Sequence, residues 1–187
     1  IAHLDRPSLP GLARAITSNA DAARSLSVRP ALLERIAAAD ASTLAKRATE
    51  LESAQELVPT GDLESFLDAL RWLRRDEQLL AACIHFAGLA DFEEVSSFLS
   101  VLAEICLQKA LGAAISVREP SVAVLGMGKI AGREFTYFSD LDLIFLYPDG
   151  AADPAGAARV AQRLIQFLTT STAAGTAYAV DSRLRPS

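Results

Sequence analysis

The hydrophobic pattern of the chain changes near Pro120, and this change limits the possible folds more than any other feature. Before it, apolar residues recur at mixed three- and four-residue spacings, which is typical of helices packed on one side. After it, short β-branched and apolar runs alternate with glycine and proline turns, which is typical of buried strands. We therefore predict an α+β chain, with a helical module over residues 1–118 and an α/β catalytic-type core over residues 119–187.

The helical module carries two clear helix signals. A predicted helix that begins near Leu63 has one apolar stripe, and Gly88 is expected to end it. Asp91 and Glu94 then stand in capping-box positions at the start of a second long helix. The first stripe leaves three basic side chains mostly elsewhere on the helix surface: Arg71, Arg74 and Arg75.

Composition and charge exclude several classes of protein. The net charge of −5 argues against a general binder of nucleic acids or anionic membranes. Cys83 and Cys106 lie in helical apolar patterns, so buried free thiols are expected. We find no apolar run of the roughly 20 residues that span a bilayer, and no signal peptide, and we predict a cytoplasmic protein. Because the sequence starts without methionine and stops after a charged motif, we expect a piece of a longer protein, truncated at its C-terminus.

The region after Pro120 is predicted to form two strands, a helix and a third strand, in that order. The run "SVAVLGMG" and the run "SDLDLIFLYP" predict the first two strands. Helical spacing returns from Pro154, and "TAYAVDSRLRPS" predicts a third strand over residues 176–187.

Two carboxylates stand one residue apart at the start of the second predicted strand. Alternation along a strand places Asp140 and Asp142 on the same face, with about 6.5–7 Å between them along the backbone. Their tips can converge on divalent metal ions, which such sites use in pairs, and a third carboxylate is expected from another strand. Asp181, in the third predicted strand, is the candidate.

Arg183 and Arg185 follow Asp181 at i+2 and i+4 on the same predicted face. A carboxylate beside two guanidinium groups suits a metal-bound polyphosphate, because the carboxylate binds the metal and the arginines bind phosphate oxygens. A structural ion pair or a solvated strand face is the alternative. The combination of Asp140, Asp142, Asp181 and the two arginines favours the phosphate site.

A glycine turn precedes the acidic pair. Gly126, Gly128 and Lys129 follow the first predicted strand, where backbone N–H groups and a lysine could approach a triphosphate. The spacing is not that of a P-loop, and a plain turn is the alternative. Ser139 either donates its hydroxyl to a phosphate or caps the entry to the strand.

These motifs resemble a known family. The stretch "LGMGKIAGREFTYFSDLDLIFLYPD", followed by "GTAYAVDSRLRPS", resembles the catalytic signature of the glutamate–ammonia ligase (glutamine synthetase) adenylyltransferase family, over roughly residues 121–187. The resemblance implies a nucleotidyltransferase core of the DNA polymerase β type, with a small mixed sheet. Ala131 departs from the pattern, because the family commonly has glycine there.

The resemblance also implies an activity. One domain of the family transfers AMP from ATP to a tyrosine of glutamine synthetase, and another removes it by phosphorolysis and releases ADP. PII-type nitrogen regulatory proteins and glutamine decide which activity runs, so glutamine synthetase and PII are the expected partners. Carried over by position, Asp140, Asp142 and Asp181 would hold Mg²⁺ or Mn²⁺, and Asp181 would help to activate the attacking oxygen.

Several readings of the function stay open. "SDLDL" and "RLRPS" resemble the adenylylating, C-terminal half of the family more, while "LGMGK" also occurs in the removing half. A regulatory or binding module whose activity lies elsewhere is a second reading. A nucleotidyltransferase acting on a small alcohol or an RNA end is a third, although the negative charge argues against RNA.

Overall fold

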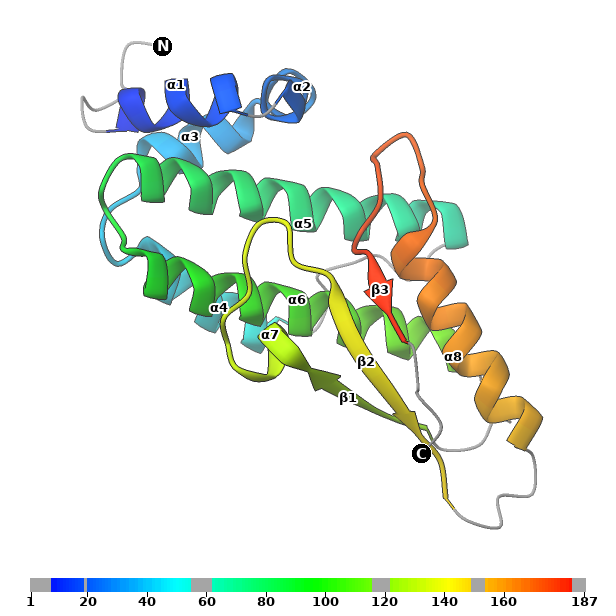
Figure 1. The fold of residues 1–187 in the computed structure, drawn as a ribbon. Helices are drawn as coiled ribbons and strands as arrows, with labels where there is room; N and C mark the ends of the chain where they lie inside the picture. Colours follow the sequence, from blue (N-terminus) through cyan, green and yellow to red (C-terminus); the bar gives the residue numbers. More distant parts are fainter. Residues whose placement is uncertain (1–7, 19, 55–61, 116–121, 149–153, 183–187) are drawn as a thin grey trace.

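The structure, a computed structural model, describes residues 8–18, 20–54, 62–115, 122–148 and 154–182. Helices form one end of the molecule, and a small sheet lies in front of the long helix Phe92–Ala114 at the other end (Figure 1). The described elements, in chain order, are α1 (Ser8–Ser18), α2 (Ala20–Val28), α3 (Ala31–Ala37), α4 (Thr43–Ser53), α5 (Leu63–Phe86), α6 (Phe92–Ala114), β1 (Ala123–Met127), α7 (Gly128–Ala131), β2 (Leu141–Leu146), α8 (Pro154–Thr169) and β3 (Val180–Asp181).

The start and stop signals of the long helices are confirmed. Asp91 and Glu94 form a reciprocal capping box, in which each side chain accepts from the other residue's backbone N–H at 2.9 Å. Gly88 follows the end of α5 with a φ of +73°, a left-handed conformation that glycine adopts without strain. Pro30 stands at the N-cap of α3 and separates that helix from α2.

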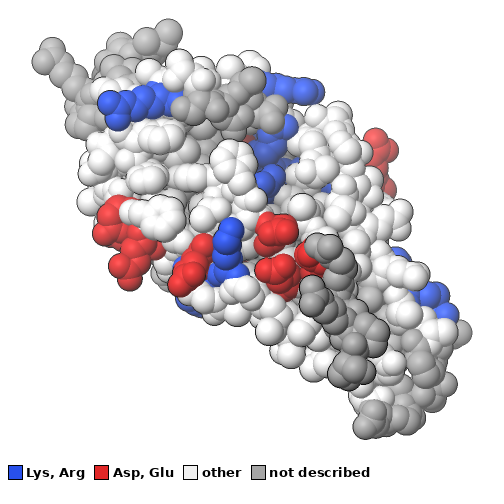
Figure 2. Space-filling view, in the orientation of Figure 1, with Lys and Arg blue, Asp and Glu red and all other residues white. Residues whose placement is uncertain are grey.

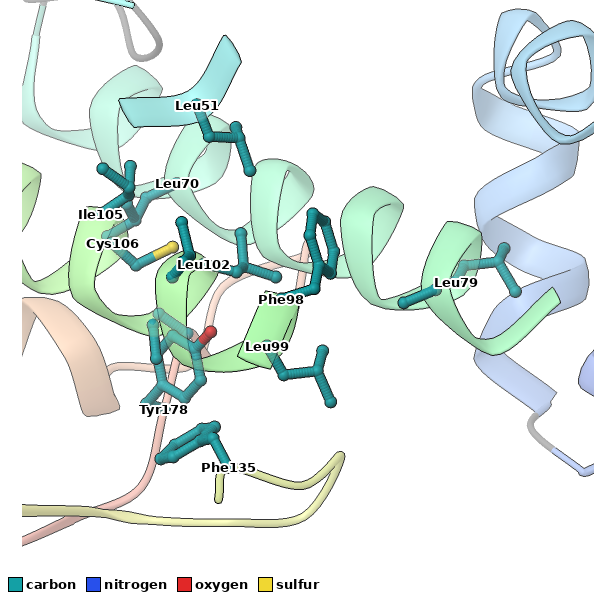
Figure 3. Close-up of a cluster of buried hydrophobic side chains, with 14 of the residues drawn as sticks. Leu51, Leu70, Leu79, Phe98, Leu99, Leu102, Ile105, Cys106, Phe135 and Tyr178 are labelled. Carbon is teal, nitrogen blue, oxygen red and sulfur yellow. The ribbon is translucent and has the colours of Figure 1, made fainter. Parts of the chain in front are cut away.

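Helix α6 is the centre of the core. It packs against α4, α5 and α8, and Figure 3 shows Leu102 and Cys106 of α6 near Leu70 of α5 and Tyr178 of the C-terminal segment. The rings of Tyr178 and Phe135 meet edge to face, with centroids 5.8 Å apart. Both predicted modules therefore contribute to one hydrophobic cluster, and the division at residue 118 stays a prediction.

The two thiols lie inside this core. Cys83 and Cys106 are buried and free, and burial raises the pKa of each thiol to about 12. The prediction of buried free cysteines is confirmed.

The sequence showed no apolar run long enough to span a bilayer, but helix α6 comes close to one. By length and composition alone it is apolar enough to cross a bilayer, and it is the one helix of the described residues that passes this test. In its most apolar window, 61% is buried inside the fold. Its apolar surface thus serves the core described above, and the test is weak evidence for a membrane span.

The strands form a mixed sheet in the order β1-β2-β3. Strand β1 runs antiparallel to β2, and β3 runs parallel to β2. Leu141 and Leu143 of β2 are buried on one face, while Asp142 between them points to the other. Figure 1 shows α6 behind the sheet and the opposite face turned toward the viewer. The prediction of an α+β fold with a small mixed sheet is confirmed.

The third strand begins later than the sequence predicts. Strand pairing starts at Val180 rather than at residue 176. The backbone N–H groups of Ala177 and Tyr178 instead donate to the carbonyl of Leu168 at the end of α8. Because both side chains are buried in the core, this segment packs on α8 and cannot also follow β2.

The expectation that Arg71 lies on the surface is wrong. Its side chain is 0% exposed. The guanidinium donates to the backbone carbonyls of Leu67, Phe167, Thr170 and Gly175, and so joins α5 to the end of α8 and the loop that follows. A planar group with five fixed donors can satisfy several orphan carbonyls at a helix end, which explains why arginine is tolerated at this depth.

Candidate active site

The strand pairing brings two of the predicted carboxylates together. Asp142 and Asp181 are direct partners across the parallel strands β2 and β3, and neighbouring strands lie about 4.8 Å apart. Both residues are half-buried, whereas Asp140, just before β2, is exposed. In Figure 2, acidic side chains gather in the region where β2 and β3 begin. The open sheet face thus carries an acidic group at the start of two adjacent strands.

Gly128 borders this group from the other side. Its neighbour Met127 pairs with Asp142 across β1 and β2. Gly128 has a φ of +56°, and a Cβ added there would overlap the Oδ2 atom of Asp142. Glycine is therefore required for two reasons, the left-handed backbone and the close approach of a carboxylate.

The rest of the glycine motif shapes the turn after β1. A Cβ at Gly126 would lie 2.9 Å from Cγ2 of Ile130, so its absence lets α7 fold closely onto the strand. Lys129 is exposed on α7. Ala131, the departure from the family pattern, is exposed and helical, a conformation that alanine adopts without strain.

Ser139 holds the loop that leads into the acidic group. Its side chain is buried, and its hydroxyl accepts from the Thr136 backbone N–H at 3.0 Å and lies 2.8 Å from the Thr136 hydroxyl. The Ser139 backbone N–H also donates to the Thr136 carbonyl at 3.2 Å. This geometry is that of a turn that caps the strand entry, one of the two roles considered for this residue.

Two serines of α6 fix the same loop, and sequence reasoning missed both. Ser96 Oγ donates to the Phe135 carbonyl at 2.9 Å, and the Phe135 N–H donates to Ser100 Oγ at 3.3 Å. Both serines are buried. The signal for them was present, because they are polar residues four apart on a helix that is otherwise apolar toward the core.

Asp140 and Asp142 lack the partners that a structural ion pair would have. In the part of the chain that the structure describes, no ion pair or hydrogen bond involves the side chain of Asp140 or Asp142. Like charges on neighbouring strands repel each other. Arg183 and Arg185, predicted to face this group, lie outside the described residues.

The donor set suits a hard divalent cation that a substrate would help to bind. Across the described ranges, no three His, Cys, Asp or Glu side chains are grouped closely enough to hold an ion by themselves. Mg²⁺ is commonly bound by one or two carboxylates together with substrate phosphates. The carboxylate oxygens of Asp142 and Asp181 fit that mode of binding, and Mg²⁺ remains a proposal.

The fold and the site together define an α+β domain with strand-borne carboxylates beside a glycine turn. The family model for glutamate-ammonia ligase adenylyltransferase matches residues 11–187. The chain therefore belongs to the glutamate-ammonia ligase adenylyltransferase family.

Curated relatives agree with this membership. A bifunctional glutamine synthetase adenylyltransferase/adenylyl-removing enzyme of Chromobacterium violaceum is 38% identical over 194 residues, covering 96% of this chain and 21% of the relative. Enzymes with the same description from Burkholderia mallei and from Neisseria meningitidis serogroup A are 36% and 39% identical over 88% and 67% of this chain. The chain spans about a fifth of the length of these relatives, or less.

Proposed function

We propose that this chain carries the catalytic carboxylates of a nucleotidyltransferase domain that transfers AMP from ATP to a tyrosine of glutamine synthetase. The observation that carries the proposal is the register of Asp142 against Asp181 on the open sheet face, beside Gly128. Family membership and the names of the relatives support the choice of reaction. The acceptor and a PII regulator come to this chain from the family resemblance, and the cytoplasmic location is the expectation from the sequence.

In the proposed site, the carboxylates of Asp140, Asp142 and Asp181 hold Mg²⁺ or Mn²⁺ with the ATP phosphates. When bound, the cation supplies charge neutralisation at the phosphate oxygens. Lys129, exposed on α7, offers a further positive charge to the phosphates, and Arg183 and Arg185 are proposed to do the same.

The proposed reaction is an in-line displacement at the α-phosphorus. The tyrosine hydroxyl oxygen forms the new bond, the bond to the bridging oxygen of the leaving pyrophosphate breaks, and the phenolic proton passes to a carboxylate, for which we propose Asp181. Much of the acceleration is expected from alignment and charge neutralisation, because no nucleophilic triad is present among the described residues.

Removal of AMP is a second candidate, favoured by the relatives' description as both adenylyltransferase and adenylyl-removing enzymes. In that direction a phosphate oxygen attacks the α-phosphorus of the tyrosyl-AMP linkage. The bond to the tyrosine oxygen breaks, and ADP leaves.

The test uses a full-length natural protein that contains this chain, with Asp142→Asn or Asp181→Asn. The intact mass of glutamine synthetase is followed in both directions, with ATP on the unmodified enzyme and with phosphate on the adenylylated enzyme. We expect the forward rate to fall by about a thousandfold or more in each variant. Glu52→Gln, which neutralises an exposed carboxylate on α4, is the matched control and should leave both rates unchanged.

The other outcomes select among the alternatives. Loss of the reverse reaction alone would assign this domain to AMP removal. Survival of both reactions would leave the chain as a regulatory or binding module. ATP turnover that depends on the carboxylates but leaves glutamine synthetase unlabelled would indicate another acceptor. Separately, Mg²⁺ or Mn²⁺ with ATP should raise the melting temperature of the unsubstituted protein and not that of Asp142→Asn, by linkage.

A further inference from the structure

A cavity of about 710 Å³ lies between helices α1, α2 and α5 and two loops, one containing Phe138 and one spanning residues 171–176. Sites for small molecules usually measure about 300–1,000 Å³. The first of these loops continues directly into Asp140. A few residues of chain therefore connect the cavity to the acidic group, but the residues that line the cavity do not include those carboxylates.

The charge of the cavity wall is positive. Its described lining residues include Arg74 and Arg75 and no aspartate or glutamate. The Arg74 guanidinium lies over the Tyr178 ring, 4.7 Å from the centroid, and its Nη1 is 3.4 Å from the Thr176 carbonyl. No ion pair in the described part of the chain involves Arg74, and its buried Nε has no hydrogen-bond partner. Arg74 is thus a positioned cation with no anionic partner among the described residues.

The rim of the cavity offers an aromatic surface. Phe138 is 97% exposed, the most exposed large hydrophobic side chain among the described residues. Its neighbour Tyr137 also lines the cavity and has a buried hydroxyl with no hydrogen-bond partner. An exposed aromatic ring and a fixed guanidinium that line the same cavity suit a ligand that has both a planar ring and a negative charge, since rings stack and arginine pairs with anions.

We propose that this cavity binds an aromatic anion of mononucleotide size, with Arg74 facing the anionic group and Phe138 stacking on the ring. Figure 2 shows basic side chains and the acidic group on the same face of the molecule. The two sites differ in chemistry, because one attracts cations and the other anions. The binding proposed here needs no metal and does not require that the carboxylates be catalytic.

The experiment is isothermal titration calorimetry on the full chain, in EDTA, with AMP as the probe. Adenosine supplies the ring without the anion, and inorganic phosphate supplies the anion without the ring. We expect AMP to bind more tightly than either. Phe138→Ala should weaken AMP binding by a factor of roughly 5–150, because stacking on an aromatic side chain commonly contributes about 1–3 kcal/mol. Arg74→Gln should weaken it at least about tenfold, because a hydrogen bond to a charged group contributes about 1.5–3 kcal/mol. Phe138→Trp should retain the affinity.

Two controls match these variants in residue type. Phe92→Ala removes another exposed phenylalanine, at the start of α6, and Arg14→Gln removes an exposed arginine of α1. Neither residue lines the cavity, so both variants should bind AMP like the unsubstituted chain. Arg74 also contacts Tyr178, so Arg74→Gln could unfold the chain; Phe138, being exposed, provides a test free of that effect.

The proposal is overturned if millimolar AMP produces no binding heat in the unsubstituted chain. It is equally overturned if Phe138→Ala binds AMP as tightly as the unsubstituted chain does, or if adenosine or phosphate alone binds as tightly as AMP. A peptide that binds the cavity where AMP does not would assign this surface to a protein partner instead.

Discussion

Glu77 of α5 and Asp142 of β2 are both carboxylates at the border of the core, yet their surroundings differ. Glu77 is 1% exposed, and its Oε1 accepts from Arg35 at 2.8 Å and from Arg47 at 2.9 Å. Asp142 is half-buried and faces Asp181 across the sheet, with no ion pair in the described chain. One carboxylate joins three helices, and the other stands beside a second negative charge.

The difference separates structural charges from charges available for chemistry. In the helical region, each buried charge has a partner that links two elements: Asp76 pairs with Arg29 at 2.6 Å, and Arg71 binds carbonyls at the end of α8. A buried charge without a partner destabilises a fold. Asp142 lowers this cost by lying half-buried on the open face of the sheet. We infer that the repulsion between Asp142 and Asp181 is retained for binding.

The largest effect on stability is expected from Arg71→Met. The substitution leaves the carbonyls of Thr170 and Phe167 without a donor, whereas the Gly175 carbonyl keeps the Thr172 N–H. Each buried carbonyl without a donor costs about 1–3 kcal/mol. We expect the free energy of unfolding to fall by about 3 kcal/mol or more, measured by urea denaturation followed by circular dichroism. Arg14→Met on the surface of α1 is the control. A loss below about 1 kcal/mol would contradict the role given to Arg71.

A smaller loss is expected from Glu77→Gln. The amide cannot neutralise Arg35 and Arg47, and breaking a buried ion pair commonly costs about 3–5 kcal/mol. Because the two arginine side chains are 38% and 24% exposed and can be hydrated, we expect a loss of about 2–3 kcal/mol in the same denaturation assay. Glu52→Gln, on the exposed side of α4, should change the value little. Equal values for the two variants would show that the buried network adds no stability.

Asp142→Asn should act in the opposite direction. It removes one of two like charges on neighbouring strands, whose repulsion is worth about 0.2–1 kcal/mol. We therefore expect the metal-free variant to be as stable as the unsubstituted chain, or more stable by up to about 1 kcal/mol. Chemical denaturation in EDTA measures this. A clear loss of stability would mean that Asp142 has a structural role, and the comparison with Glu77 would fail.

The smallest effect is a pH dependence at Asp76. Burial raises the pKa of this carboxyl above 3.8, despite the opposing attraction of Arg29. A pKa that is higher in the folded state means that the folded state binds the proton more tightly. This contribution to stability is present below pH 3.8 and is lost as the pH rises through the raised pKa. The unsubstituted chain should therefore lose stability relative to Asp76→Asn as the pH rises through the raised pKa. A difference in unfolding free energy between the two that stays constant over this pH range would contradict the prediction.

Sequence reasoning located the strands, the turn and the candidate carboxylates because these signals are local. The run "SDLDLIFLYP" predicted a strand, and the structure has β2 over Leu141–Leu146, with Leu141 and Leu143 buried. The capping box of α6 is also a short-range pattern, and it was found in place. The roles of Asp140, Asp142 and Asp181 in metal binding remain predictions.

Arg71 and the serines of α6 could not be placed in the same way. Their partners lie far away in the chain: Arg71 binds Thr170, and Ser96 binds Phe135. The apolar stripe predicts which side of α5 is buried, but it does not predict which backbone carbonyls of distant segments will lie next to that side. The predicted start of the third strand failed for the same reason, because Ala177 and Tyr178 bind Leu168 at the end of α8.

The sequence by itself determined the order of helices and strands, the glycine turn, and the spacing of Asp140, just before β2, and Asp142 within it. These follow from backbone geometry and from periodicities of about 3.6 and 2 residues, which act over a few positions. Only the tertiary structure decided that Asp181 pairs with Asp142 and that Arg74 lines a cavity. It also decided that residue 128 must be a glycine, because a Cβ there would overlap the Asp142 carboxylate. Those facts depend on register and packing between segments distant in the chain, where burial and the pairing of polar groups select one arrangement.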